Sequence, residues 1–408
     1  MTKKTDTPAI RFKGFSDTWE QRKLGDVVQI TMGQSPDGST YSDEPSDYIL
    51  VQGNADLQNG WVCPRIWTTQ ITKKADAGDL IMSVRAPAGA MGKTAYNAVI
   101  GRGVAAIKGN EFIYQLLVKM DADGFWKILS CGSTFESLNS ENIKNAEVKI
   151  PTTAEQIKIG GYFQQLDNLI TLHQREYEKL HNIKKSMLEK MFPKNGSNVP
   201  EIRFKGFTEA WEQRKLLEFG LATGGTSIES EFSEDGVYKV ISIGSYSEDN
   251  VYRDQGIRAV RSDKTVNRIL NKGDITMILN DKTASGNIIG RVLLIEESGV
   301  YVYNQRTERI EVDNSNYDSQ FIYTMLNAPA IRDRIIKQSQ GNTQIYVNWT
   351  TISQTDYLVP QFSEQRKIGE YFANLDHLIT LHQRELEKLQ NIKKSMLEKM
   401  FVSEEKRK

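Results

Sequence analysis

The stretch that decides the fold is EQIKIGGYFQQLDNLITLHQREYEKLHNIKKSMLEKMF, residues 155–192, which returns with few changes as EQRKIGEYFANLDHLITLHQRELEKLQNIKKSMLEKMF, residues 364–401. Neither copy contains proline, and apolar residues recur every three or four positions, as on one face of an α-helix. Pro193 and Gly196 follow the first copy and end it. The sequence therefore predicts a helix from about residue 152 to residue 191, roughly 60 Å long at 1.5 Å per residue, and a second copy of it.

A helix this long with a narrow apolar stripe needs a partner that covers the stripe, and its own duplicate is the nearest candidate. We therefore expect the two helices to pack as a coiled coil. A whole globular block connects them, so the sequence leaves parallel and antiparallel packing both open. The alternative is that the stripe faces the globular cores and that no coiled coil forms.

A second repeat precedes each variable block: PAIRFKGFSDTWEQRKL, residues 8–24, returns as PEIRFKGFTEAWEQRKL, residues 200–216. The chain is therefore a tandem duplication in which a short motif, a variable block and a long helix occur twice. The variable blocks share only sparse landmarks, such as AGDLIMS against KGDITMI and FIYQLL against FIYTML. Short β-type runs broken by Gly, Asn and Asp predict mostly-β blocks of one fold with two different surfaces.

These repeats set the expected domains. Residues 1–151 hold the first motif and block, residues 152–192 the first long helix, residues 193–360 a linker with the second motif and block, and residues 361–408 the second helix with a charged tail. The expected fold class is α+β, with two mostly-β domains of similar fold, two long helices and pseudo-two-fold symmetry.

The composition describes a globular chain of 408 residues, 39% hydrophobic and 25% charged, which at about 150 residues per domain leaves room for two or three domains. Basic and acidic residues number 52 each, so net charge alone predicts no polyanionic partner. No apolar run approaches the roughly 20 residues of a membrane span, and the first residues lack a signal-peptide pattern. We therefore expect a cytoplasmic protein with no membrane partner.

Missing catalytic motifs narrow the function. No two of the ten prolines are adjacent, which excludes the Asp/Asn-Pro-Pro-aromatic motif of DNA amino-methyltransferases. The stretch APAGAMGKT, residues 86–94, ends like a phosphate-binding loop but has Pro87 where that loop needs glycine. The four histidines lie on the long helices without a metal-binding pattern. We therefore expect a chain with no catalytic residue, no metal site and no cofactor of its own.

The duplicated RFKGF…WEQRKL motif, the repeated helix and the Gly-rich turns at residues 32–36 and 224–226 together resemble the specificity subunit of type I restriction–modification systems. The resemblance covers essentially the whole chain and implies that each variable block is a target recognition domain for double-stranded DNA. It implies that the helices pack as an antiparallel coiled coil that spaces these domains. It also implies two modification subunits, which use S-adenosylmethionine to methylate adenine at N6, and two restriction subunits, which use ATP and Mg to translocate and cut DNA.

Two similar domains about an approximate two-fold axis would present one face to opposite DNA strands, and because their sequences differ, their half-sites would differ. We therefore expect an asymmetric bipartite target whose unread spacer follows the helix length. Four residues inserted near Met191, about 6 Å of helix, should lengthen the spacer by roughly one to two base pairs. Two alternatives stay open: a DNA-specificity subunit of a system other than type I, and a coiled-coil scaffold for protein interactions.

Base reading needs donors and acceptors that reach the major groove, chiefly Arg or Lys to guanine and Asn or Gln to adenine. Such residues should lie on loops of the variable blocks, in or beside Gly-, Pro- or Thr-rich stretches. The DNA-binding candidates are Gln34, Ser35, Lys73, Lys74, Arg85, Lys93, Arg102, Ser133, Thr134, Thr226, Ser227, Lys264, Asn280, Lys282, Thr283, Arg291, Arg306, Asn342 and Thr343. The repeated basic run on the helices gives the partner-binding candidates Lys184, Lys185, Lys190, Lys393, Lys394 and Lys399.

Both variable blocks carry more acidic than basic residues, although phosphate neutralisation normally supplies much of the affinity for DNA. We expect this chain to supply base discrimination while partner subunits provide much of the contact with the DNA backbone. The isolated chain should then bind DNA weakly and with poor specificity.

Overall fold

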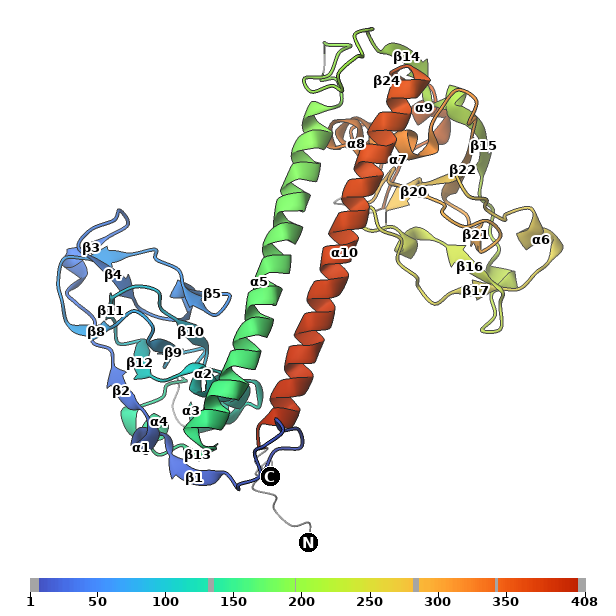
Figure 1. Ribbon diagram of the computed structural model, residues 1–408. Coiled ribbons are helices and arrows are strands. Elements are labelled where there is room, and N and C mark those ends of the chain that lie inside the picture. Colours follow the sequence, from blue (N-terminus) through green and yellow to red (C-terminus); the bar gives the residue numbers. More distant parts are fainter. Residues whose placement is uncertain (1–6, 131–135, 195, 282–285, 342–343, 403–408) are drawn as a thin grey trace. The chain divides into compact units, whose positions relative to one another are not determined.

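The computed structural model describes residues 7–130, 136–194, 196–281, 286–341 and 344–402. It divides into two compact units: unit 1 is Met1–Gln174 with Arg384–Lys408, and unit 2 is Arg175–Gln383. Each unit contains one variable block and a section of both long helices, α5 (Thr153–Lys190) and α10 (Phe362–Met400) (Figure 1). The bounds of α5 and α10 confirm the two helices expected from the repeats.

Unit 1 is built on two main sheets and a short ribbon. The first sheet has the order β2 (Gln29–Met32), β12 (Val104–Lys108), β9 (Leu80–Ser83), β10 (Met91–Lys93), β6 (Trp61–Val62) and β5 (Leu57–Gln58). The second has the order β3 (Tyr41–Ser42), β7 (Trp67–Thr68), β4 (Tyr48–Val51), β11 (Ala98–Ile100) and β8 (Lys73–Ala75). The ribbon pairs β1 (Glu20–Lys23), from the short motif, antiparallel with β13 (Glu147–Ile150).

Short helices fill the connections of unit 1. They are α1 (Leu24–Val27), α2 (Glu111–Ala122), α3 (Phe125–Ser130) and α4 (Ser140–Lys144), with 3-10 turns η1 (Gly38–Thr40) and η2 (Asn54–Asp56). Helix α2 starts where it does because the Asn110 side chain accepts a hydrogen bond from the backbone N–H of Ile113.

Unit 2 repeats this plan with different residues. One sheet has the order β15 (Gly220–Gly224), β22 (Thr307–Val312), β18 (Ile275–Ile278) and β20 (Val292–Leu294), and another β17 (Arg258–Ala259), β16 (Tyr238–Ile241) and β21 (Tyr301–Tyr303). Two ribbons pair β14 (Glu212–Lys215) with β24 (Asp356–Val359) and β19 (Asn280–Asp281) with β23 (Ile345–Tyr346). The helices are α6 (Asp263–Val266), α7 (Ser319–Asn327), α8 (Pro329–Ile336) and α9 (Trp349–Ile352), with turns η3 (Leu216–Phe219), η4 (Glu229–Glu231) and η5 (Ile243–Ser245).

The two blocks share one topology. The order β2-β12-β9-β10 in unit 1 corresponds to β15-β22-β18-β20 in unit 2, and all neighbours in both runs are antiparallel. Likewise β7-β4-β11 corresponds to β17-β16-β21, with the first pair antiparallel and the second parallel in both units. The expectation of two mostly-β domains of similar fold is therefore confirmed.

Each unit closes its core with aromatic side chains from the short motif, the block and the end of a long helix. In unit 1 the Phe401 ring lies 5.1 Å from Phe112 and 6.2 Å from Trp19 between ring centroids. In unit 2 the Phe192 ring lies 6.0 Å from both Trp211 and Phe321. The identical ends of the two helix repeats thus complete two cores whose other residues differ, and burial of these rings removes their apolar surface from water.

The long helices run antiparallel within each unit. In unit 1 Lys393 Nζ, late in α10, lies 2.6 Å from Asp167 Oδ1, early in α5. In unit 2 Lys184, late in α5, lies 2.5 Å from Asp376, early in α10. Part of the apolar stripe faces the core of the block, since Ile159 of α5 belongs to the core cluster of unit 1 and Ile392 of α10 packs against it. No helix in the described ranges is long and apolar enough to span a membrane.

Candidate nucleic-acid interface

In unit 1 the Gly-rich turn after β2 packs against the turn that joins β11 to β12. Gly33 N–H donates to Val104 O at 3.0 Å, and Gln34 N–H donates to Ile100 O at 2.8 Å. A Cβ on Gly33 would lie 2.1 Å from Gly101 O, so the sequence needs glycine for this approach. The Arg102 backbone N–H then donates to Ser35 Oγ at 3.1 Å.

Unit 2 repeats the crossing of the two turns. Gly225 N–H donates to Thr307 O at 2.8 Å, and a Cβ on Gly225 would lie 2.1 Å from Asn304 O. Ile228 N–H donates to Asn304 Oδ1 at 3.1 Å. The two Gly-rich turns singled out from the sequence are therefore equivalent elements. Each is held by the turn that precedes β12 or β22.

A third loop meets these turns in both units. In unit 1 Val84 N–H donates to Gly103 O, and in unit 2 Leu279 N–H donates to Arg306 O, both at 2.9 Å. We call the assembly of residues 33–36, 84–85 and 101–103 loop cluster 1, and that of residues 225–229, 279–280 and 304–306 loop cluster 2. The same backbone hydrogen bonds place the two clusters at corresponding positions of the shared fold.

The loop clusters bring together many of the predicted DNA-binding residues. Cluster 1 contains Gln34, Ser35, Arg85 and Arg102, and cluster 2 contains Thr226, Ser227, Asn280 and Arg306. Side chains of Gln34, Arg85, Arg102, Thr226, Ser227 and Arg306 are exposed. Arginine and amide side chains are among the groups that can read base edges in DNA.

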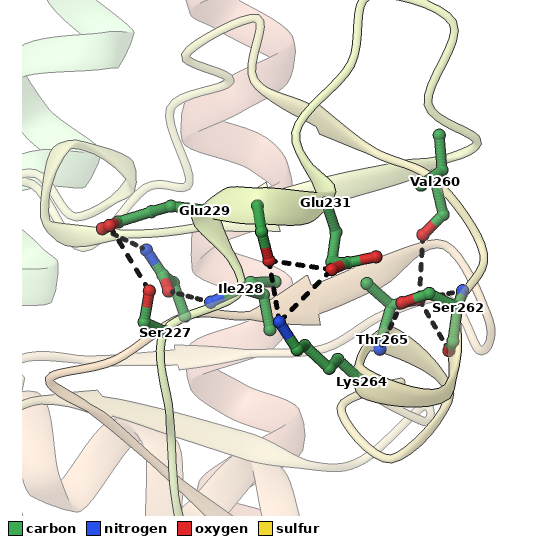
Figure 2. A network of polar contacts seen from close by, with 10 residues as sticks. Ser227, Ile228, Glu229, Glu231, Val260, Ser262, Lys264 and Thr265 are labelled. Carbon is green, nitrogen blue, oxygen red and sulfur yellow. Dashed lines mark hydrogen bonds and ion pairs between the residues drawn. The ribbon is translucent and has the colours of Figure 1, made fainter.

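Three further predicted lysines lie next to the clusters. Thr72 Oγ1 donates to Gln34 O, which brings the start of β8, with exposed Lys73 and Lys74, beside cluster 1. Lys264 of α6 donates to Ser230 Oγ at 2.9 Å and pairs with Glu231 at 3.5 Å, so it lies beside η4 (Figure 2).

Two predicted residues serve the scaffold. Lys93 Nζ pairs with Glu111 at 3.0 Å and lies over the Tyr114 ring, 4.5 Å from its centroid. Arg291 Nε donates to Asn287 O at 2.8 Å, and burial lowers the pKa of its guanidinium. Both side chains are occupied by contacts within their own unit. The remaining candidates Ser133, Thr134, Lys282, Thr283, Asn342 and Thr343 lie outside the described residues.

Arg268 joins loop cluster 2 although no sequence pattern pointed to it. Its Nη1 donates to Gly224 O at 2.8 Å and to Tyr303 Oη at 3.0 Å, and its Nη2 donates to Thr226 Oγ1 at 3.1 Å. Close by, burial raises the pKa of Glu308 to about 7, and the Arg268 charge opposes that rise. Arg268 therefore braces the Gly-rich turn from a segment far away in the sequence.

Glu229 and Gln305 are two further residues of loop cluster 2 that were not predicted from the sequence. Gln305 Nε2 donates to Glu229 Oε1 at 3.0 Å, so the two residues join the Gly-rich turn to the β21–β22 turn. The sequence offered one usable signal: Gln305 precedes Arg306 in the turn that leads into a β-type run, TERIEV. Glu229 was not predicted, because it is acidic and the prediction rested chiefly on cations and amides.

The six predicted partner-binding lysines divide into two groups. Lys184 and Lys393 form the ion pairs between α5 and α10, and Lys190 lies 3.4 Å from Glu201. The second group, Lys185, Lys394 and Lys399, is exposed on the helix surface. The described residues hold no group of three or more His, Cys, Asp or Glu side chains arranged for a metal ion.

Two strand-rich blocks on one topology, each with an equivalent polar loop cluster, define a protein with two recognition domains. The family model described as "Type I restriction modification DNA specificity domain" matches this chain twice, over residues 16–182 and 208–391. The chain belongs to this family and carries two copies of its domain.

Relatives and a solved structure agree with this assignment. The chain is 29% identical over 182 residues to a predicted type I restriction enzyme MjaX specificity subunit of Methanocaldococcus jannaschii, covering 42% of each chain. It is 25% identical to the MjaVIII specificity subunit of the same organism, over 70% of this chain and 67% of the relative. It also shares its fold with the type I restriction-modification S subunit from M. genitalium, with a TM-score of 0.70, 16% identity, and 98% and 100% of the two chains covered. Thus the chain spans less than half the length of the first of these relatives.

Proposed function

We propose that this chain is the sequence-specific DNA-recognition subunit of a type I restriction–modification complex. Loop cluster 1 reads one half of an asymmetric bipartite site, and loop cluster 2 reads the other half. The observation that carries the proposal is the duplication itself. Equivalent backbone hydrogen bonds build both clusters, whereas their side chains differ, with Arg102 in one turn and Gln305 and Arg306 in the other. Such a design presents two base preferences from one scaffold.

The partners in this proposal are double-stranded DNA, two modification subunits and two restriction subunits. Duplicated features on the long helices support docking of two identical partners. A hollow of about 540 Å³ beside Ile183 and Met187 of α5 has a counterpart of about 530 Å³ beside Ile392 and Met396 of α10. In addition Leu169 and Leu172 of α5 and their counterparts Leu378 and Leu381 of α10 are exposed.

The chemistry is assigned to the partners. The modification subunits would use S-adenosylmethionine to methylate adenine at N6, and the restriction subunits would use ATP with Mg to translocate and cut unmodified DNA. This chain positions them in the cytoplasm on a chosen sequence and contributes no catalytic group. Because both blocks are acidic overall, the partners also supply much of the contact with phosphates, and the isolated chain binds DNA weakly.

Single-molecule methylation sequencing tests the proposal. A plasmid is sequenced from cells that express this chain with the modification subunit encoded beside it, and from cells that lack only this chain. The expected result is an N6-methyladenine motif with two unlike halves that depends on the chain. No new motif, from a partner that is active with another specificity subunit, would overturn the proposal and favour a scaffold for protein interactions.

A further inference from the structure

Loop cluster 2 contains an acidic side chain held in a fixed position. On Oε1 the Glu229 carboxylate accepts hydrogen bonds from Gln305 Nε2 at 3.0 Å and from Asn304 Nδ2 at 3.4 Å. On Oε2 it accepts a hydrogen bond from Ser227 Oγ at 3.4 Å (Figure 2). Asn304 is itself fixed, since its Oδ1 accepts from the backbone N–H of Ile228. Glu229 remains exposed to solvent, and these donors hold its carboxylate in a fixed orientation.

Glu229 lines a hollow of about 340 Å³ together with Gln305 and Arg306. Phe232 and Ile257 supply apolar walls. Because the amide nitrogen of Gln305 is used on Glu229, its carbonyl oxygen is left as a second acceptor beside the carboxylate. The rim therefore presents two neighbouring acceptors above an apolar wall.

A carboxylate at a DNA-binding surface repels phosphates and loses affinity unless it meets a hydrogen-bond donor. In the major groove only the N4 amino group of cytosine and the N6 amino group of adenine are donors, whereas guanine and thymine present O6, N7 or O4 acceptors there. We propose that Glu229, with Gln305 beside it, reads an exocyclic amino group of cytosine or adenine at one position of the half-site bound by unit 2. It excludes guanine and thymine at that position by repulsion between acceptors.

Unit 1 provides the internal contrast. Gly101 N–H donates to Val51 O of β4, and Asn304 N–H donates to Ile241 O of the equivalent strand β16. Gly101 therefore corresponds to Asn304, and the residue that follows it, Arg102, corresponds to Gln305. The Asp37 carboxylate accepts hydrogen bonds from the backbone N–H and the hydroxyl group of Ser39, so it is bonded within its own turn. Loop cluster 1 therefore offers a donor where loop cluster 2 offers acceptors, and the two half-sites differ in kind at that position.

This inference rests on the proposed function, and the test keeps the two apart. The full chain is co-expressed with its modification subunit as wild type, Glu229→Gln and the matched control Glu234→Gln, and the methylated motifs are sequenced. Glu234 is an exposed carboxylate of the same block, for which the structure shows no side-chain partner in the described ranges. Glu229→Gln should admit a keto base at one position of one half-site only, because glutamine adds a donor. Arg102→Ala, made in parallel, should alter the other half.

A binding arm identifies the atom that is read. The assembled complex is titrated with duplexes in which adenine is replaced by purine, or cytosine by 2-pyrimidinone, so that the exocyclic amino group is absent. At the position read by Glu229 the wild type should lose affinity roughly 10-fold to 100-fold. The Glu229→Gln complex should lose much less, and the Glu234→Gln complex should lose as much as the wild type. Which analogue has this effect distinguishes adenine from cytosine.

Several outcomes would overturn the inference. They are an unchanged motif in an active Glu229→Gln complex, a change confined to the half altered by Arg102→Ala, or an equal loss with the analogues in wild type and Glu229→Gln. If Glu229→Gln fails to assemble, Gln305→Met tests the same position, because it removes the second acceptor and one donor that holds Glu229. An unchanged motif in an active Gln305→Met complex would then overturn it. If the wild-type complex produces no methylated motif, the proposed function itself is overturned.

Discussion

Arg11 donates two parallel hydrogen bonds to Glu155, from Nε to Oε1 at 2.6 Å and from Nη2 to Oε2 at 2.7 Å. The Glu155 side chain is fully buried, and Arg203 makes the same two bonds to Glu364 in unit 2. The pair ties the short motif to the first turn of the long helix that follows the block. Both repeats therefore form one structural element in each unit, although a whole variable block separates them in the sequence.

Removal of one partner from this pair should be costly. In Arg11→Met the Glu155 carboxylate stays buried without its counter-charge, and the free energy of unfolding should fall by about 3 kcal/mol. Urea unfolding measures the loss, with Arg22→Met as the control, because the Arg22–Glu20 pair is exposed. The double variant Arg11→Met with Glu155→Leu should recover most of the loss. If it is as unstable as the single variant, the uncompensated charge is not the cause.

Glu308 should make the stability of unit 2 depend on pH. Burial raises its pKa to about 7, so the folded state binds a proton more tightly than the unfolded state does. Its contribution is therefore present at low pH and is lost as pH rises between about 4.5 and 7. Glu308→Gln should flatten this slope in unfolding experiments from pH 5 to pH 8, and Glu234→Gln should leave it unchanged. Equal slopes in Glu308→Gln and wild type would contradict the assignment.

Gly33→Ala should disturb one half-site alone. The added methyl group would meet Gly101 O, so the two turns of loop cluster 1 must separate. We expect altered or lost methylation at the half read by unit 1, with the other half retained in the motifs that persist. Gly38→Ala is the control, since open space surrounds a Cβ there. Changes in both halves after Gly33→Ala would argue that the two clusters do not read separately.

A circular permutant should fold. In unit 2 the chain runs directly from α5 to the short motif, and Ile202 N–H donates to Lys190 O at 2.9 Å. In unit 1 Ile10 N–H makes the same bond to Lys399 O at 2.9 Å, although the two segments are opposite ends of the sequence. A chain with residue 408 joined to residue 1 and opened within residues 195–198 should therefore keep the wild-type melting temperature within a few degrees and the same methylated motif. A chain that is unfolded, or folded with a new motif, would show that the covalent linker 193–199 matters.

Helix length should set the spacer. Insertion near Met191 is the wrong place for a test, because Met191 and Phe192 are buried in the core of unit 2. Seven residues inserted after Gln174 and after Gln383 keep the phase of the apolar stripe and add about 10 Å to each helix. At about 3.4 Å per base pair, methylation sequencing should find a spacer longer by about three base pairs. An unchanged spacer in an active variant would rule out the helices as a ruler.

The helices and the duplication could be read from the sequence because both are local signals. Apolar spacing specified α5, and the near identity of the repeats specified α10 and the shared fold of the blocks. The direction of packing needed long-range contacts, such as Lys393 with Asp167, which no local pattern encodes.

The loop clusters were predictable only in part. Gly33 and Gly225 marked the turns, because close backbone approach demands glycine. What meets those turns depends on sheet topology: Arg268 reaches Thr226 from 42 residues away, and Gln305 reaches Glu229 from 76. Lys93 looked like a free cation beside a Gly-rich loop, yet the parallel pairing of β10 with β6 places it next to Trp61, and it pairs with Glu111.

The position of Phe401 in the core of unit 1 has a consequence for synthesis. The buried core of unit 2 uses residues from Met191 to Leu375, whereas that of unit 1 starts at Trp19 and needs Met400 and Phe401. At about 5–20 residues per second, a ribosome takes on the order of tens of seconds to pass from the first block to the end of α10. The block made first is thus expected to be finished last, with Trp19 and Phe112 open to water and to chaperones until the final helical turn emerges.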